Sequence, residues 1–153
     1  MNYRYPRVRI HEIVKAKKCL DEGASITPPG KTSPLQKFDA SLQLVDGPFC
    51  DLRFTGKAVR LDDPTSYHTN LLLDQRRVRG VGFSPIAKQN FRSSQRMPKG
   101  WHENVCDPNS ATDHPDWNRH MPLPDFSPTD YADFVKLSAE RWNIDLGWEE
   151  GLL

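Results

Sequence analysis

The stretch from Tyr67 to Phe83, YHTNLLLDQRRVRGVGF, decides the fold. Its first part, YHTNLLLD, predicts a strand that presents every second side chain on one face. These side chains are Tyr67, Thr69, Leu71 and Leu73. The second part, from Gln75 to Phe83, places Val81 and Phe83 two residues apart. Because very few residues separate the two runs, the stretch predicts a β-hairpin.

Two further strands are expected before this hairpin. Residues Gln36–Val45 alternate through Leu42 and Leu44, and Phe49–Leu61 alternates apolar with polar side chains. Gly56 lies inside the second run and suggests a bulge or bend. With the hairpin, these strands predict an antiparallel β-meander.

A helix is expected on each side of the meander. Arg9–Glu22 spaces apolar residues in a helical rhythm, and Gly23 is a plausible stop. Near the C-terminus, Ser127 is placed as N-cap, with Pro128 at the first helical position and Asp130 close to a capping box. The face of this helix that is expected to be buried carries Tyr131, Phe134, Val135 and Trp142.

The segment from Asn90 to Asn118 shows no sustained periodicity and is predicted to be irregular. A loop of that length is uncommon in a compact domain and is often functional. The sequence therefore predicts one α+β domain over residues 1–153. It consists of an antiparallel β-meander packed with an N-terminal and a C-terminal helix, and a long irregular loop near 90–120.

The bulk composition favours a cytoplasmic protein that does not enter a membrane. No apolar stretch approaches the ~20 residues that a membrane-spanning helix requires. Residues 1–10 are basic and lack the apolar region of a secretory signal. The three cysteines, Cys19, Cys50 and Cys106, lie far apart and form no CxxC pair, which fits a reduced compartment.

Charge is distributed unevenly along the chain. Residues 53–99 hold ten Lys and Arg against three acidic residues, whereas residues 101–153 hold three against eleven. A basic centre can attract the phosphate groups of a nucleic acid. The alternative is that the two parts pack together and neutralise each other.

The predicted loop contains a possible set of zinc ligands, namely His102, Cys106, His114 and His120. Their spacing matches none of the usual fingers or knuckles, and no second short pair is present. We therefore expect no metal and no cofactor, although the pattern leaves zinc open.

A catalytic interpretation requires fewer groups. Cleavage of RNA without a metal needs a general base, a general acid and cations around the phosphate. His102, with Glu103 beside it, is the candidate for the acid–base work, since imidazole titrates near neutrality. The candidates for binding the nucleic acid are Arg77, Arg79, Arg92, Arg96, Lys99 and Trp101. Arg77 and Arg79 are expected to share a face because they lie two residues apart in a strand.

Two of these assignments have a structural alternative. His102 could be a solvated or hydrogen-bonded residue with no chemical role. Trp101 and Trp117 could stack on bases, but tryptophans in long loops more often hold the loop against the core, which is the interpretation we favour.

The second half of the chain resembles the TumE-like toxins of bacterial toxin–antitoxin systems and their uncharacterised relatives. The resemblance rests on the strand pair that ends LLLDQRRVRGVGF, the loop segment GWHEN, the segment DWNRHMPLPDF and the closing FVKLSAERWNI. It implies a toxin-type ribonuclease that has an antitoxin as partner. The loop of those proteins typically holds an H-x-H pair, whereas here Asn104 takes the place of the second histidine.

Two functions of different classes follow. The first is a small cytoplasmic endoribonuclease of toxin type that cleaves RNA without a metal. The second is a non-enzymatic module for protein binding, immunity or phage conflict that uses its acidic C-terminal region. Trp148, Leu152 and Leu153 could dock that tail into a basic groove of a protein partner, including a second copy of the chain as a homodimer. The alternative for the tail is a frayed terminus.

Overall fold

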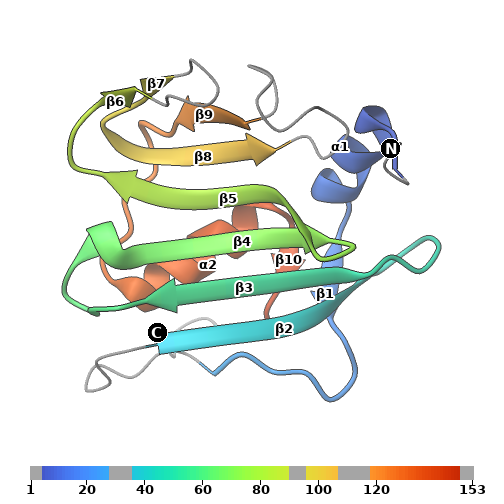
Figure 1. Cartoon of the computed structure of the whole chain (residues 1–153). Helices are drawn as coiled ribbons and strands as arrows, with labels where there is room; N and C mark the ends of the chain where they lie inside the picture. The colour runs from blue at the N-terminus through green and yellow to red at the C-terminus, as the bar shows by residue number, and fades with distance from the viewer. Residues whose placement is uncertain (1–4, 28–35, 90–95, 107–117, 149–153) are drawn as a thin grey trace.

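A computed structural model describes residues 5–27, 36–89, 96–106 and 118–148. The fold is α+β, as expected: a mixed sheet of eight strands in the order β10-β1-β2-β3-β4-β5-β8-β9, with helix α2 (Tyr131–Arg141) behind it in Figure 1. The strands of this sheet are β1 (Lys18–Leu20), β2 (Gln36–Leu44), β3 (Leu52–Ala58), β4 (Tyr67–Leu73), β5 (Arg76–Ser84), β8 (Gly100–Cys106), β9 (Asn118–Pro122) and β10 (Ile144–Asp145). The remaining elements are helix α1 (Arg7–Lys15), the short turn η1 (Pro64–Ser66) and the strand pair β6 (Lys88–Gln89) and β7 (Arg96–Met97).

The predicted hairpin is confirmed as β4 and β5, and the two strands expected before it are β2 and β3. Asp74 and Gln75 form the turn of the hairpin with φ values of 49° and 65°. Positive φ at both central residues is what a two-residue turn between right-twisted strands requires. Neighbouring strands from β1 to β9 pair antiparallel, but β1 pairs parallel with β10, so the sheet is mixed.

The first helix is shorter than the sequence predicts. Residues 7–15 are helical, but Ala16 turns to an extended conformation with ψ 146°. Residues 18–20 then form β1 between β2 and β10. The prediction of a helix to Glu22 is therefore wrong, because hydrogen bonds to two strands compete with helix propagation in this segment.

The prediction of an irregular segment near 90–120 is also wrong for residues 100–106 and 118–122. Six residues of β8 pair with β5, and five pair with β9. Polar residues stand on both faces of β8, so the segment lacks the apolar alternation that marks a strand. Residues 90–95 and 107–117 of the predicted loop lie outside the described residues.

The second helix begins three residues later than expected. Asp130, and not Ser127, is the N-cap, since its carboxylate accepts the backbone N–H of Asp133 at 2.8 Å. The Asp133 carboxylate in turn accepts the backbone N–H of Thr129 at 2.9 Å. These reciprocal bonds resemble a capping box.

The core lies between α2 and the side of the sheet that faces it. The four side chains predicted to line the helix, Tyr131, Phe134, Val135 and Trp142, are all buried, as expected. The predicted bulge at Gly56 does not occur, since β3 keeps its register with both neighbours. Gly56 instead makes room for Phe38, because a Cβ atom there would lie 2.2 Å from the Phe38 ring.

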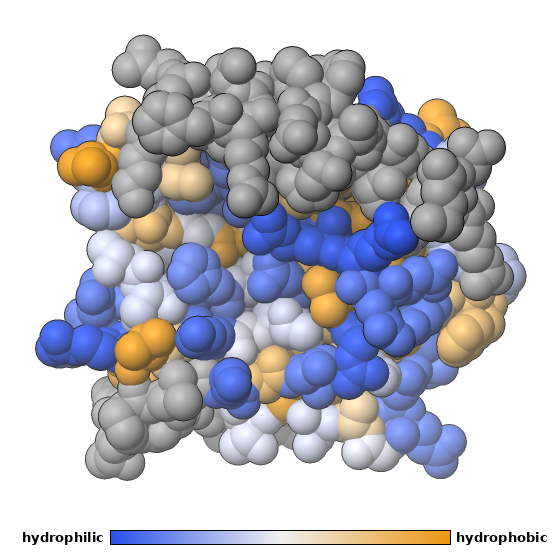
Figure 2. Space-filling view, viewed as in Figure 1, coloured by the Kyte–Doolittle hydropathy of each residue, from blue (hydrophilic) through white to orange (hydrophobic). Residues whose placement is uncertain are grey.

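The other side of the sheet faces the viewer in Figure 1. Figure 2 shows that hydrophilic side chains cover much of this surface over β2, β3, β4 and β5. We call it the open face. Neither helix in the described part of the chain is long or apolar enough to cross a membrane.

A candidate active site on the open face of the sheet

A straight row of polar residues crosses the open face at one level of the sheet. Lys57 of β3 stands opposite His68 of β4, His68 opposite Gly82 of β5, and Gly82 opposite His102 of β8. Residues that stand opposite one another in neighbouring strands point to the same face. The sheet therefore places one histidine on each side of a glycine.

Gly82 has no side chain between the two imidazoles, and we call this position the trough over Gly82. A Cβ atom on Gly82 would lie 3.4 Å from Nδ1 of His68 and 3.8 Å from Nε2 of His102. Both nitrogens thus lie close to one point above the strand. At Gly80, a Cβ atom would lie 2.8 Å from the Asn70 side chain, so any larger residue there would displace a neighbour.

A third histidine joins this cluster from the edge strand. The ring of His120, on β9, lies 5.7 Å from the ring of His102, measured between centroids. His120 stands opposite Asn104, and its Nδ1 donates a hydrogen bond to the Asn104 side-chain oxygen. We call His68, His102 and His120 the histidine cluster.

Backbone contacts fix the tautomer of His102. Its Nδ1 lies 3.2 Å from the carbonyl oxygen of Gly100, which can only accept, so Nδ1 carries the proton. The neutral ring therefore has its basic nitrogen at Nε2, on the side of Gly82. His102 itself is only 4% exposed, whereas His68 is exposed and His120 is half-buried.

The histidine cluster favours neutral imidazole. Burial lowers the pKa of His102 below its usual value, and the Gly100 carbonyl opposes that effect only in part. Burial of the ring against the sheet also lowers the pKa of His68, and the nearby charge of Lys57 adds to it. For His120, burial and then the proximity of His102 lower the pKa. At neutral pH these rings can accept a proton.

Of the two arginines expected to share a face, only one lies on the open face. The pairing of β4 with β5 shifts between Leu71 and Leu72, so that Leu72 stands opposite Arg77 and Leu71 opposite Arg79. Val78 is the extra residue of this bulge. The prediction that Arg77 and Arg79 share a face is therefore wrong. Arg77 lies on the open face, where its charge helps to lower the pKa of His68 and His120.

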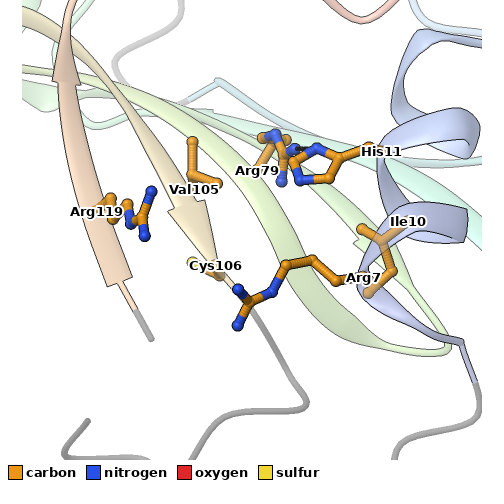
Figure 3. A pocket seen from close by; sticks show the side chains of 7 residues that line it. All are labelled: Arg7, Ile10, His11, Arg79, Val105, Cys106 and Arg119. Carbon is orange, nitrogen blue, oxygen red and sulfur yellow. Dashed lines mark hydrogen bonds between the residues drawn. The ribbon is translucent and has the colours of Figure 1, made fainter. Parts of the chain in front are cut away.

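Arg79 faces α1 instead. Its guanidinium donates to Nδ1 of His11 at 2.9 Å and to the carbonyl of Val78 at 2.7 Å. It lines a separate cavity of about 80 Å³ between α1 and strands β5, β8 and β9 (Figure 3). The lining residues are Arg7, Ile10, His11, Arg79, Val105, Cys106 and Arg119.

Glu103 also lies on the side opposite His102, because successive residues of a strand point to opposite faces. Its carboxylate is buried and accepts the indole N–H of Trp142 at 2.8 Å. It also forms an ion pair with Arg141, with 3.0 Å between Oε2 and Nε. The structure thus does not bring Glu103 together with His102, and the contacts of Glu103 hold the end of α2 against β8.

Trp101 packs toward the core, in agreement with the structural interpretation that we favoured. Its ring lies 5.0 to 5.3 Å, between centroids, from Phe83, Phe126 and Phe134. It therefore holds the start of β8 against α2 and is not placed to stack on a base at the open face. The sequence alone does not show which way Trp101 points. Its face can be assigned from strand alternation only when residues 100–106 are known to form a strand.

The remaining candidates belong to other segments or lie outside the described residues. Lys99 is exposed just before β8, and Arg96 belongs to β7. Arg92 lies outside the described residues, as do Trp117 and the proposed zinc ligand His114. In the part of the chain that the structure describes, no three His, Cys, Asp or Glu side chains are grouped to hold a metal. Cys106 is buried.

The tail residue Trp148 packs against its own chain. Its indole N–H donates to the carbonyl of Ile26 at 2.6 Å, and its ring packs against the core of its own chain. Leu152 and Leu153 lie outside the described residues.

Sequence reasoning missed two members of the site. His68 had no role assigned to it, and His120 was considered only as a zinc ligand. A signal existed for His68: it lies between Tyr67 and Thr69, so it must point away from the core. Gly80 and Gly82, two apart in the facing strand, leave space on that same side.

The chain matches no protein-family model, no curated protein and no solved structure. We therefore infer a function from the side chains of the site itself.

Proposed function

We propose that the protein is a metal-independent endoribonuclease whose reaction centre is the trough over Gly82, between His68 and His102. The observation that carries the proposal concerns the two strands that flank β5. Each contributes one imidazole with a ring nitrogen within 3.8 Å of the position that a Cβ atom would take on Gly82. A phosphate group in that trough would have a proton acceptor on one side and a proton donor on the other. Such positioned acid–base groups typically accelerate a reaction by about 10² to 10⁴-fold.

In this proposal His102 is the general base. Its Nδ1–H is held by Gly100, so Nε2 can take the proton from the ribose 2′-hydroxyl. The 2′-oxygen then bonds to phosphorus, and the bond from phosphorus to the 5′-oxygen breaks. Because burial lowers the pKa of His102, the ring is neutral and ready to accept at pH 7.

His68 is the general acid. It must be protonated to donate to the departing 5′-oxygen, and the charge of a bound phosphate favours that form. Arg77 supplies a fixed positive charge near the same rings, where negative charge develops on the phosphate oxygens. The products are a 2′,3′-cyclic phosphate and a 5′-hydroxyl end.

The test is cleavage of a single-stranded RNA oligomer in the presence of EDTA, with the product ends identified by mass. We expect His68→Asn and His102→Asn each to lower kcat/KM by about 100-fold or more. His11→Asn is the matched control, since His11 contacts Arg79 on the other side of the sheet and should leave cleavage unchanged. Circular dichroism is used to check that each variant is folded.

Three results would contradict the proposal. They are undiminished cleavage by His102→Asn, loss of cleavage in EDTA, and equal cleavage of a DNA oligomer, which has no 2′-hydroxyl. A folded chain that cuts no RNA would favour the alternative class, a non-enzymatic module for protein binding or immunity.

We also propose a setting for this activity. The resemblance to TumE-like toxins suggests a cytoplasmic toxin that an antitoxin holds inactive. The described cysteines, Cys19, Cys50 and Cys106, are all free thiols, which is in keeping with a reducing compartment. Copurification with the product of an adjacent small reading frame would test the antitoxin, and light scattering would test a homodimer.

A further inference from the structure

The row that holds the two histidines continues beyond them on the open face. Lys57 stands opposite His68, and Lys37 of β2 stands opposite Lys57. Neighbouring strands lie about 4.8 Å apart, so the two lysines follow the trough at successive strand spacings. Both side chains are exposed.

A hollow of about 590 Å³ lies at this end of the row. It is open to solvent and begins directly beside His68. Its polar lining is formed by Lys37, Asp39, Thr55, Lys57, His68 and Asn70.

The charge of this hollow is positive. Its one carboxylate, Asp39, lies 2.6 Å from Arg53 and is thereby neutralised. Among the described residues, no carboxylate pairs with Lys37 or Lys57. Two ammonium groups therefore face solvent beside the histidine cluster, each on a flexible stem that can follow a phosphate.

We infer that Lys37 and Lys57 form a subsite for the phosphate groups of single-stranded nucleic acid, next to the trough over Gly82. The inference rests on the proposed function for what occupies the trough. It implies that the substrate crosses the strands from β8 toward β2, and that it extends past the cleaved bond by at least one phosphate. A dinucleotide would fill the trough but leave the subsite empty.

Binding of an oligomer that cannot be cleaved tests the subsite without cleavage. The probe is a fluorescent 2′-O-methyl octauridylate, and its affinity is measured by anisotropy over a range of salt concentrations. Each phosphate contact on a single strand contributes about 0.7 to the slope of log K against log salt. We expect the double variant Lys37→Gln/Lys57→Gln to reduce that slope by about 1.4.

The matched control is Lys17→Gln/Lys136→Gln, which removes the same charge from outside the row, since Lys136 lies on α2 behind the sheet. Its slope should equal that of the native chain. An unchanged slope in Lys37→Gln/Lys57→Gln would overturn the inference. So would equal competition by polyglutamate, which would assign the row to an acidic protein segment.

Cleavage separates this inference from the proposed function. If both hold, Lys37→Gln/Lys57→Gln lowers kcat/KM for an RNA octamer and leaves that for a dinucleotide unchanged. Reduced slope without any cleavage would leave the subsite standing and remove the ribonuclease. If the lysine variant cleaves both substrates at native rates and its slope is unchanged, the ribonuclease proposal stands and the subsite is excluded.

Discussion

Tyr131 and Tyr67 are packed against each other in the core, with ring centroids 5.1 Å apart, yet their hydroxyl groups differ. The hydroxyl of Tyr67 donates to the carbonyl of Leu61. That of Tyr131 is buried and, within the described chain, has no hydrogen-bond partner. Burial raises the pKa of Tyr131 well above its usual value, so the hydroxyl stays protonated.

Removal of these two hydroxyls should therefore have opposite effects. We expect Tyr131→Phe to raise the free energy of unfolding by about 1 kcal/mol, because an unpaired buried polar group is lost. Tyr67→Phe should lower it by about 1 kcal/mol, since it leaves the Leu61 carbonyl without this donor. Urea unfolding measures both, and a loss of stability in Tyr131→Phe would mean that its hydroxyl has a partner.

The histidine cluster should make the fold sensitive to acid. The pKa of His102 is lower in the folded chain than its ordinary value of 6.5, so below pH 6.5 the unfolded chain binds more protons. Stability is therefore complete above pH 6.5 and is lost as the pH falls through the folded pKa. Each unit of difference in pKa corresponds to about 1.4 kcal/mol.

We expect the urea concentration at the unfolding midpoint to decrease as the pH is lowered from about 7.5 to about 5. The decrease should be smaller in His102→Gln. Lys136→Gln, far from the cluster, should keep the native dependence. A His102→Gln curve that runs parallel to the native curve at all pH values would show that His102 does not carry the effect.

At the scale of elements, the start of α2 distinguishes two possible caps. Asp130 accepts the N–H of Asp133, whereas Ser127, the cap expected from sequence, is exposed and lies before the helix. Asp130→Ala should cost about 1 kcal/mol of unfolding free energy, and Ser127→Ala should cost less than about 0.5 kcal/mol. Thermal or urea unfolding of the two variants decides, and a larger loss in Ser127→Ala would contradict the structure.

Elements defined by local pattern were predictable, and those defined by distant pairing were not. The alternation of Tyr67–Leu73 and the spacing of residues 131–142 are local signals. The strand occurs where expected, and the helix occurs with its start three residues later than expected. β8 is polar on both faces, and its pairing partners lie on β5 and β9, so nothing within residues 100–106 marks it as a strand. The bulge at Val78 could not be predicted from local sequence either, because a register shift depends on both paired strands.

At the scale of the whole molecule, this bulge decides which charges serve the site. One extra residue in β5 sends Arg77 to the open face and Arg79 toward α1. Strand alternation likewise separates His102 from Glu103, which sequence neighbourhood had placed together. Thus His102 and Arg77 could be named from sequence, but His68 and Lys57 join them only through the order of the strands.

Lys18 connects distant parts of the chain. Its side chain is fully buried, and its ammonium group donates to the carbonyls of Val14 and Trp142 at 2.7 Å and to that of Ala16 at 2.8 Å. These acceptors lie near the C-terminal ends of α1 and α2, just before the strands β1 and β10, which pair in parallel. The lysine thus ties the first helix to the last through one buried group.

The same burial predicts how stability responds to alkaline pH. Burial lowers the pKa of Lys18 from its ordinary 10.5 to about 7, an effect that the three carbonyl acceptors oppose. Between these two values the unfolded chain binds a proton that the folded chain has released, so stability rises with pH. The slope should be at most about 1.4 kcal/mol per pH unit from about pH 7 to about pH 9.

Lys18→Met should remove this rise, because neither state then titrates at that position, while the exposed neighbour Lys17→Met should keep it. Urea unfolding of the three proteins at several pH values measures the slope. If Lys18→Met follows the native curve in parallel, the ammonium form is retained in the fold and the carbonyls outweigh burial. If the unfolding free energy of the variant depends less on pH than that of the native chain, the group that links the two helix ends is the Lys18 amine with its pKa lowered by burial.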